Sequence, residues 1–217
     1  MGSIISVAGA CSRAGKTALA VSMVGALGPG TAAVKFTTTE DVFERCPRGT
    51  TCIVCDIDVP FRIVEDPVVL DRPGTDTQRL REAGAAPVVW AIARGSSVAP
   101  AWAAVRGRVA AAPVVVMEGS TIVHTARPGL TAFVVHPFLS PERWKRGSEA
   151  LIRKADVVVV NRPSAERRAP ALSVLRAIER ARPQGPVLTG DVLLPLAEWA
   201  PGLDGRVRAA VAAEVRA

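Results

Sequence analysis

The sequence contains no tyrosine, and phenylalanine and tryptophan bring the aromatic share of its 217 residues to only 4%. Proteins that hold single-stranded nucleic acid stack the bases on aromatic side chains, so this scarcity argues against such a platform. The 27 Lys and Arg residues outnumber the 20 Asp and Glu residues, but they are spread along the chain rather than clustered. We interpret the net charge of +7 as a basic surface that favours anionic ligands, and we expect no nucleic-acid partner.

Long apolar runs are also missing. No stretch approaches the roughly 18 consecutive apolar residues of a membrane span, and the first residues lack the charged start and cleavage site of a signal peptide. We therefore expect a cytoplasmic protein with no membrane partner. The chain has only two histidines, His124 and His136, and neither belongs to a Ser-His-Asp order or a histidine-rich metal motif.

Apolar runs typical of strands alternate with stretches of helical pattern along most of the chain. The expected strands are Ile4–Ala8, Ala32–Phe36, Pro87–Ile92, Pro113–Met117, Thr131–Val135, Asp156–Val160 and Pro186–Leu188. The expected helices are Lys16–Leu27, Thr75–Ala83, Ala99–Ala111, Pro141–Lys154, Ala165–Ala181 and Gly205–Val215. This alternation predicts an α/β fold with a doubly wound, mostly parallel sheet, formed by a single domain of residues 1–217.

Residues 37–72 interrupt the alternation. They contain three of the four cysteines, several acidic residues and no clear period. We interpret them as an irregular, cysteine-containing insertion after the second strand, because long loops inside compact domains usually carry function.

The first expected strand leads into Ala10-Cys11-Ser12-Arg13-Ala14-Gly15-Lys16-Thr17, and a helix-forming run follows. This order of strand, loop and helix is that of a P-loop, whose backbone N–H groups surround the phosphates of a nucleotide. The loop residues Ser12, Arg13, Ala14 and Gly15 would bind the phosphates of ATP or GTP. Lys16 would neutralise their charge and take part in catalysis, and Thr17 would bind Mg²⁺. The consensus places a glycine where this chain has Ala10, and its glycine comes one place earlier, at Gly9.

A P-loop also needs an acidic partner for Mg²⁺ or for the attacking water, commonly at the end of a neighbouring strand. Glu118 follows the apolar run Val114–Met117 and is the candidate for this catalytic and metal-binding role, with Asp56 and Asp58 as rivals. Asn161 follows another apolar strand, where its amide could both donate to and accept from a nucleobase. Asn161 also precedes Arg162-Pro163, so a role in the turn alone stays open.

With these motifs in place, the chain resembles the molybdopterin-guanine dinucleotide biosynthesis adaptor family, P-loop proteins of the same broad class as dethiobiotin synthetase and the metal-delivery GTPases. The resemblance rests on the P-loop, the segment Pro73–Ala85, the Met117-Glu118-Gly119 strand end and the run Ala155–Asn161. The family's Lys-His pair after the second strand appears here as Lys35-Phe36. The guanine-reading Asn-Lys-x-Asp of GTPases appears as Asn161-Arg162-Pro163-Ser164, without the terminal carboxylate, which leaves the choice between ATP and GTP open.

Three cysteines, Cys46, Cys52 and Cys55, form a C-x5-C-x2-C cluster. Disulfides are disfavoured in a reducing cytoplasm, whereas closely spaced thiolates suit an iron–sulfur cluster or Zn²⁺. Unliganded or redox-active thiols are the remaining alternative. With three ligands, the fourth could come from a partner chain, a substrate, water or a carboxylate such as Asp56.

Three functions follow from these features. The first is a slow NTPase that serves the maturation or delivery of a cofactor, as the resemblance implies for molybdenum cofactor, and acts as a homodimer with a recipient metalloenzyme as partner. The second is an ATP-dependent small-molecule kinase or ligase like dethiobiotin synthetase. The third is a redox or metal sensor that binds nucleotide without catalysis. The clustered cysteines favour the first and the third, because a kinase has no need of them.

Overall fold

The computed structural model describes residues 2–39 and 59–212. Within these ranges eight strands form one sheet in the order β3-β4-β2-β5-β1-β6-β7-β8. All neighbouring strands run parallel except β3 and β4, which are antiparallel. The strands are β1 Ser3–Gly9, β2 Thr31–Thr38, β3 Phe61–Val64, β4 Val88–Ala93, β5 Val114–Glu118, β6 Leu130–Val135, β7 Val157–Asn161 and β8 Val187–Gly190. The predicted α/β fold with a mostly parallel sheet is confirmed.

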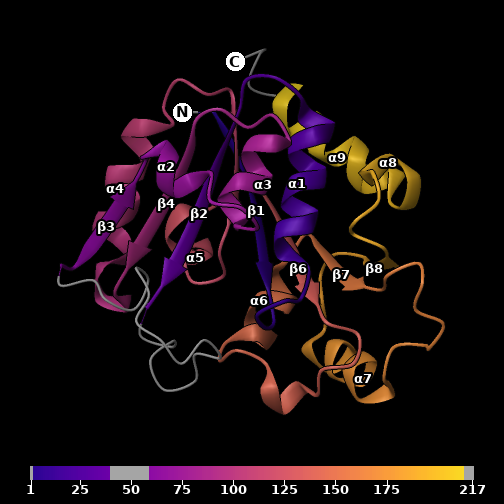
Figure 1. Ribbon diagram of the computed structural model, residues 1–217. Helices are drawn as coiled ribbons and strands as arrows, with labels where there is room; N and C mark the ends of the chain where they lie inside the picture. Colours follow the sequence, from indigo (N-terminus) through magenta and orange to yellow (C-terminus); the bar gives the residue numbers. More distant parts are fainter. Residues whose placement is uncertain (1, 40–58, 213–217) are drawn as a thin grey trace.

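Helices cover both faces of the sheet, as Figure 1 shows. One face is packed by α1, α3, α8 and α9, whose apolar side chains share a core cluster with β1 and β5. The opposite face is packed by α4 and α5 beside β2 and β4, and by α6 and α7 beside β6 and β7. The helices are α1 Lys16–Leu27, α2 Pro67–Leu70, α3 Asp76–Glu82, α4 Val98–Arg108, α5 Val123–Ala126, α6 Ser148–Lys154, α7 Leu172–Ala181, α8 Leu196–Trp199 and α9 Pro201–Ala212.

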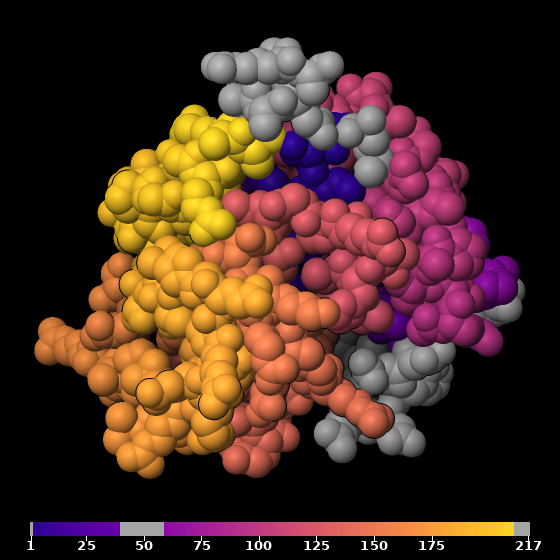
Figure 2. Space-filling model, turned by 180° about the vertical axis from the view of Figure 1, so that it is seen from behind, coloured from indigo at the N-terminus to yellow at the C-terminus, as the bar shows by residue number. Residues whose placement is uncertain are grey.

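The second face is seen from behind in Figure 2, where the residues after β5 lie in the middle and the magenta residues that include α4 lie to one side. Strands buried between two helical layers are apolar on both sides, which explains uninterrupted runs such as Val157–Val160. None of the helices in the described part of the chain combines the length and the apolarity that a bilayer crossing requires.

All seven expected strands are present, but two expected helices begin later than predicted. Pro141–Arg143 forms only a 3₁₀ turn, and α6 starts at Ser148 because Gly147 adopts a left-handed φ of 81° that separates the two segments. The expected helix from Ala165 starts at Leu172, since Pro170 disfavours helical backbone in the residue before it.

The prediction that residues 37–72 are irregular is wrong at both described ends. Thr37 and Thr38 complete β2, and in the second described range the chain forms the edge strand β3 and the short helix α2. Val64 of β3 and Leu70 of α2 pack with Ile92 of β4 in a small apolar cluster. The three clustered cysteines and Asp56 and Asp58 lie outside the described residues.

Candidate functional site

The loop between β1 and α1 lies at the carboxyl edge of the sheet, where β1 separates β5 from β6. The chain winds to opposite sides of the sheet at this point, and such a switch point is where open α/β sheets bind ligands. Helix α1 begins at Lys16, and no side chain caps its N-terminus, where Gly15 is the N-cap residue. Its first backbone N–H groups therefore remain available to an anion.

Two residues give the loop its turn. Arg13 has φ 58° and Gly15 has φ 105°, both in the left-handed region. A Cβ added to Gly15 would come within 2.5 Å of the Asn161 amide nitrogen, so a side chain is excluded here by space as well as by backbone conformation.

Ala10 occupies the consensus glycine position without difficulty. Its N–H donates to the Val134 carbonyl of β6 at 3.0 Å, so the residue continues the pairing of β1 before the loop turns away. The preceding Gly9 carries the close approach instead, because a Cβ there would meet the Lys16 side chain at 2.8 Å and the Val134 carbonyl at 2.9 Å.

The Lys16 side chain folds back along the loop, and its ammonium group donates to the Cys11 carbonyl at 2.6 Å. Burial lowers the pKa of Lys16 to about 8, against the opposing attraction of Glu118. Because burial disfavours the charged form of Lys16, an anionic neighbour such as a phosphate would stabilise the ammonium group.

On the β5 side of the loop, four side chains form a connected polar network, which we call the acidic flank: Thr17, Lys35, Asp76 and Glu118. The Thr17 hydroxyl lies 2.9 Å from a carboxylate oxygen of Asp76 and 2.9 Å from one of Glu118. The Lys35 ammonium donates to the other Asp76 oxygen at 2.5 Å and to the other Glu118 oxygen at 2.6 Å. Each carboxylate therefore has one oxygen near Thr17 and one bound to Lys35.

The acidic flank extends from the buried end of β5 to the half-exposed start of α3, where the Asp76 side chain is 43% exposed. Glu118 is 2% exposed at the end of β5, and parallel pairing places it opposite Lys35 in β2. Burial alone would lower the pKa of Lys35, but attraction to Glu118 and Asp76 outweighs it and raises that pKa. Burial likewise raises the pKa of Asp76, and the nearby Lys35 reverses the shift and lowers it. Lys35 and Asp76 are therefore both charged at neutral pH.

On the β6 side of the loop, the charges are positive, and we call Arg143 and Lys145 the basic flank. Both residues precede α6, and the Lys145 backbone N–H donates to the Ala10 carbonyl at 2.6 Å. Burial raises the pKa of the Cys11 thiol within the loop, while the charges of Lys16, Lys145 and Arg143 oppose that rise.

Asn161 reaches the loop from the end of β7. Its amide nitrogen donates to the Ala14 carbonyl at 3.1 Å, while its buried carbonyl oxygen accepts no hydrogen bond from the described residues. The amide therefore braces the loop next to Gly15 and keeps an acceptor free. Behind it, the Asp191 carboxylate after β8 accepts from the backbone N–H groups of Ser164 and Leu193, at 2.7 and 3.0 Å, and joins the β7 and β8 loops.

The fold brings together the predicted residues Lys16, Thr17 and Glu118, and it places Asn161 against the P-loop. Lys35 and Asp76 belong to the same network, but sequence reasoning gave neither of them a role. Two sequence features could have identified them. Lys35 is a single charged residue inside the apolar strand β2, and Asp76 directly follows Thr75, whose hydroxyl caps α3 by accepting from the Gln78 N–H. Cys46, Cys52 and Cys55 lie outside the described residues. Among the residues that the structure describes, no group of three or more His, Cys, Asp or Glu side chains is placed to hold a metal.

No protein-family model matches the chain, and no curated protein sequence matches it. Solved structures do match. HypB from Helicobacter pylori in complex with nickel aligns at a TM-score of 0.49 and 11% identity, over 96% of this chain and 88% of HypB. The septum site-determining protein MinD from Pyrococcus horikoshii, complexed with Mg-ADP, aligns at a TM-score of 0.44 and 16% identity, over 99% of this chain and 96% of MinD.

Proposed function

We propose that this chain binds a Mg²⁺–nucleoside triphosphate at the loop of residues 10–17 and hydrolyses it slowly. One observation carries the proposal: the P-loop lysine, the first-turn threonine and two carboxylates from separate elements meet at the carboxyl edge of the sheet. Phosphoryl transfer depends on positioning and on charge stabilisation more than on covalent participation of the protein, and these groups supply both.

The donor set fits Mg²⁺. The Thr17 hydroxyl and the carboxylates of Asp76 and Glu118 are hard oxygen donors, which this ion prefers, and it commonly takes only one or two protein carboxylates together with phosphates and water. Bound there, Mg²⁺ would neutralise phosphate charge. Lys35 already binds the remaining carboxylate oxygens and holds both carboxylates in place. Lys16 and the N-terminus of α1 would bind the phosphates themselves.

The adenine or guanine base would lie beside Asn161. The free carbonyl oxygen of its amide would accept a hydrogen bond from the N6 amine of adenine, and at that position guanine carries the O6 carbonyl, which is itself an acceptor. The chain has Ser164 where guanine-reading proteins have an aspartate. Together these two features favour ATP, and we expect it to bind more tightly than GTP.

We further propose that nucleotide hydrolysis serves cofactor maturation or delivery, as the resemblance to the molybdopterin-guanine dinucleotide adaptor family implies. The support is the cluster of Cys46, Cys52 and Cys55, which would hold an iron–sulfur cluster or Zn²⁺. The last described strand before this segment is β2, whose final residue, Thr38, lies at the carboxyl edge of the sheet that carries the phosphate loop. A homodimer and a recipient metalloenzyme as partner belong to the same proposal, and light scattering of the purified protein tests the first of these.

Lys35 supports a second candidate, an ATP-dependent kinase or ligase. A lysine 18% exposed at the side chain, next to the metal-binding carboxylates, could orient an acidic substrate for phosphoryl transfer. A kinase would release little phosphate without its acceptor, whereas the first candidate hydrolyses ATP alone.

Phosphate release from ATP and GTP, measured on anaerobically purified protein with metal and sulfide analysis of the same sample, tests these proposals. We expect slow, Mg²⁺-dependent release and a brown protein absorbing near 400 nm, a colour that Cys52→Ser removes. Colourless protein with stoichiometric zinc would exclude the iron–sulfur cluster, and protein free of metal would exclude both. Phosphate release equal to that of Lys16→Ala would exclude the hydrolase.

A further inference from the structure

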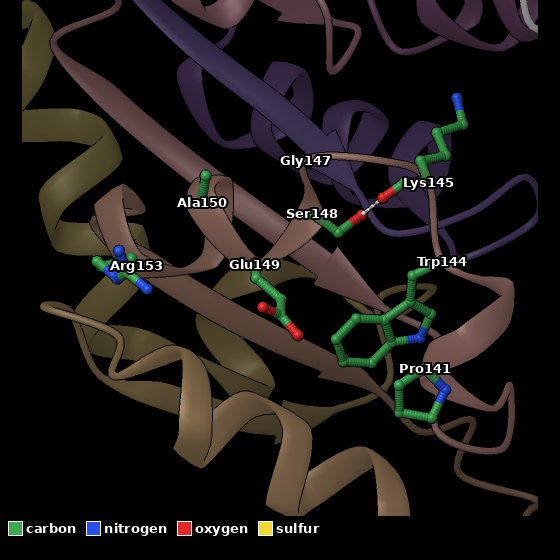
Figure 3. Close-up of a pocket in the computed structure, with 8 residues that line it drawn as sticks. All are labelled: Pro141, Trp144, Lys145, Gly147, Ser148, Glu149, Ala150 and Arg153. Carbon is green, nitrogen blue, oxygen red and sulfur yellow. Dashed lines mark hydrogen bonds between the residues drawn. The ribbon is translucent and has the colours of Figure 1, made fainter.

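The segment between β6 and α6 presents Lys145 to solvent beside the phosphate loop. Trp144 has an extended backbone, with φ −71° and ψ 153°, so its neighbours project away from the side that its own ring takes. The Trp144 ring packs on the apolar cluster under α6 and α7, and its N–H donates to the Leu139 carbonyl at 3.2 Å. Figure 3 shows the Lys145 ammonium pointing away from the Trp144 ring and from Glu149.

The Lys145 backbone is fixed on both sides. Its N–H donates to the Ala10 carbonyl at 2.6 Å, and its carbonyl accepts from both the backbone N–H and the hydroxyl of the buried Ser148, at 3.1 and 2.6 Å. No ion pair joins its side chain to an acidic residue among those described. Lys145 therefore has a fixed backbone beside the phosphate loop and an exposed ammonium group that is available to an anion.

The position of the Lys145 backbone beside the phosphate loop determines which phosphate of the nucleotide its side chain would contact. In a P-loop, backbone N–H groups next to the helix surround the α- and β-phosphates, and the lysine reaches toward the β- and γ-phosphates. Here the Lys16 ammonium lies on the Cys11 carbonyl, so the γ-phosphate end of the site is the Ala10–Cys11 end of the loop. Lys145 is anchored at that same end.

The charges point the same way. Repulsion from Lys145 adds to burial in lowering the pKa of Lys16, so the two ammonium groups interact electrostatically across the loop. Glu118 offsets part of the positive charge on Lys16, and the remaining repulsion between the two lysines is relieved when an anion binds between them. The carboxylates of the site stand on the opposite flank, where Lys35 and Thr17 already bind them.

We propose that Lys145 binds the γ-phosphate of the nucleotide from the β6 side, and so makes the site select triphosphate over diphosphate. This inference rests on the proposed function. The ammonium group forms a charge-assisted hydrogen bond with a γ-phosphate oxygen and transfers no proton. Because a diphosphate lacks that group, Lys145 contributes to the binding of ATP and not to that of ADP.

Calorimetric titration of the whole protein with Mg²⁺–ADP and with a non-hydrolysable Mg²⁺–ATP analogue tests the inference. We expect Lys145→Met to weaken binding of the ATP analogue about tenfold, the effect of one charge-assisted contact, and to leave ADP affinity within about twofold. Lys145→Arg should retain most of the preference. Lys154→Met removes an exposed lysine at the end of α6 and serves as the matched control, with affinities equal to those of the wild type.

Two results would overturn the inference while leaving nucleotide binding intact: no change in Lys145→Met, or equal losses for ADP and the ATP analogue. Binding of neither nucleotide by the wild-type protein would overturn the proposed function itself and this inference with it. Thermal unfolding of each variant confirms that the fold is retained, which we expect because the anchoring hydrogen bonds are made by the Lys145 backbone.

Discussion

The acidic flank and the basic flank of the phosphate loop differ in how completely their polar groups satisfy one another. On the acidic flank, Lys35 donates to one oxygen of each carboxylate, and the single hydroxyl proton of Thr17 serves the other oxygen of either Asp76 or Glu118. On the other side, no ion pair within the described residues involves Lys145, and Asn161 has a buried acceptor without a donor. A satisfied network holds its shape without ligand, whereas unsatisfied groups gain free energy when a ligand supplies their partners. The contrast assigns pre-organisation to one flank and ligand recognition to the other.

The largest effect is expected from Lys16→Ala, which removes the cation at the centre of the loop. A buried ammonium bound to phosphate contributes a charge-assisted interaction, so we expect nucleotide affinity to fall about 100-fold or more. Calorimetric titration with Mg²⁺–ATP measures the change, and Lys154→Ala is the control. Unchanged binding in Lys16→Ala would refute the phosphate-loop assignment.

The next effect tests the acidic flank. Glu118→Gln keeps the shape of the side chain but removes the negative charge that Lys35 and Thr17 bind. We expect phosphate release to fall roughly 10- to 100-fold, because charge stabilisation is the main catalytic contribution at such sites. The free energy of unfolding should fall by about 1–3 kcal/mol, the cost of leaving a buried partner unsatisfied.

Phosphate-release assays and urea unfolding measure these two quantities for Glu118→Gln. Glu149→Gln removes the same charge from an exposed position on α6 and should leave both unchanged. Full activity in Glu118→Gln would show that the acidic flank has only a structural role.

A smaller effect is expected at the base. Asn161→Ala removes both the brace on the Ala14 carbonyl and the free acceptor, so we expect about a tenfold loss of ATP affinity, worth about one good hydrogen bond. The preference for ATP over GTP should disappear in parallel titrations, while Gln184→Ala, an exposed amide, should retain it. Preserved discrimination in Asn161→Ala would leave Asn161 with the role of a turn residue.

The smallest effect concerns the loops behind Asn161. Burial raises the pKa of Asp191, but hydrogen bonds from the Ser164 and Leu193 backbones outweigh it and lower that pKa. A depressed carboxyl pKa stabilises the fold above the unfolded-state pKa, and the contribution is lost as pH falls through the folded-state value. We expect Asp191→Asn to lower the free energy of unfolding at pH 7 by about 1–2 kcal/mol.

Urea unfolding at pH 7 and at acidic pH measures the effect of Asp191→Asn. The difference from the wild type should shrink on acidification, and the exposed Glu198→Gln should show no difference at either pH. A difference that is the same at both values would mean that the Asp191 charge contributes nothing.

The features that could be predicted from the sequence are those whose signal lies within one short segment of the chain. Strands buried on both faces carry their own apolar run, and Lys16 and Thr17 are recognisable because strand, loop and helix follow each other directly. Lys35 and Asp76 could not be assigned in this way, because they meet Glu118 only after β2 pairs with β5 and α3 packs beside them. Strand β3 was missed because its four residues are few and lie at the sheet edge, where the apolar signal is weak.

The division between the two flanks is tested most directly by titrating the wild-type protein with ATP in the presence of Mg²⁺ and again in the presence of EDTA. If the basic flank, Lys16 and Asn161 recognise the nucleotide while the acidic flank binds the metal, ATP binds under both conditions and binds more tightly with Mg²⁺. No binding under either condition, or equal affinity with and without the metal, would contradict the account.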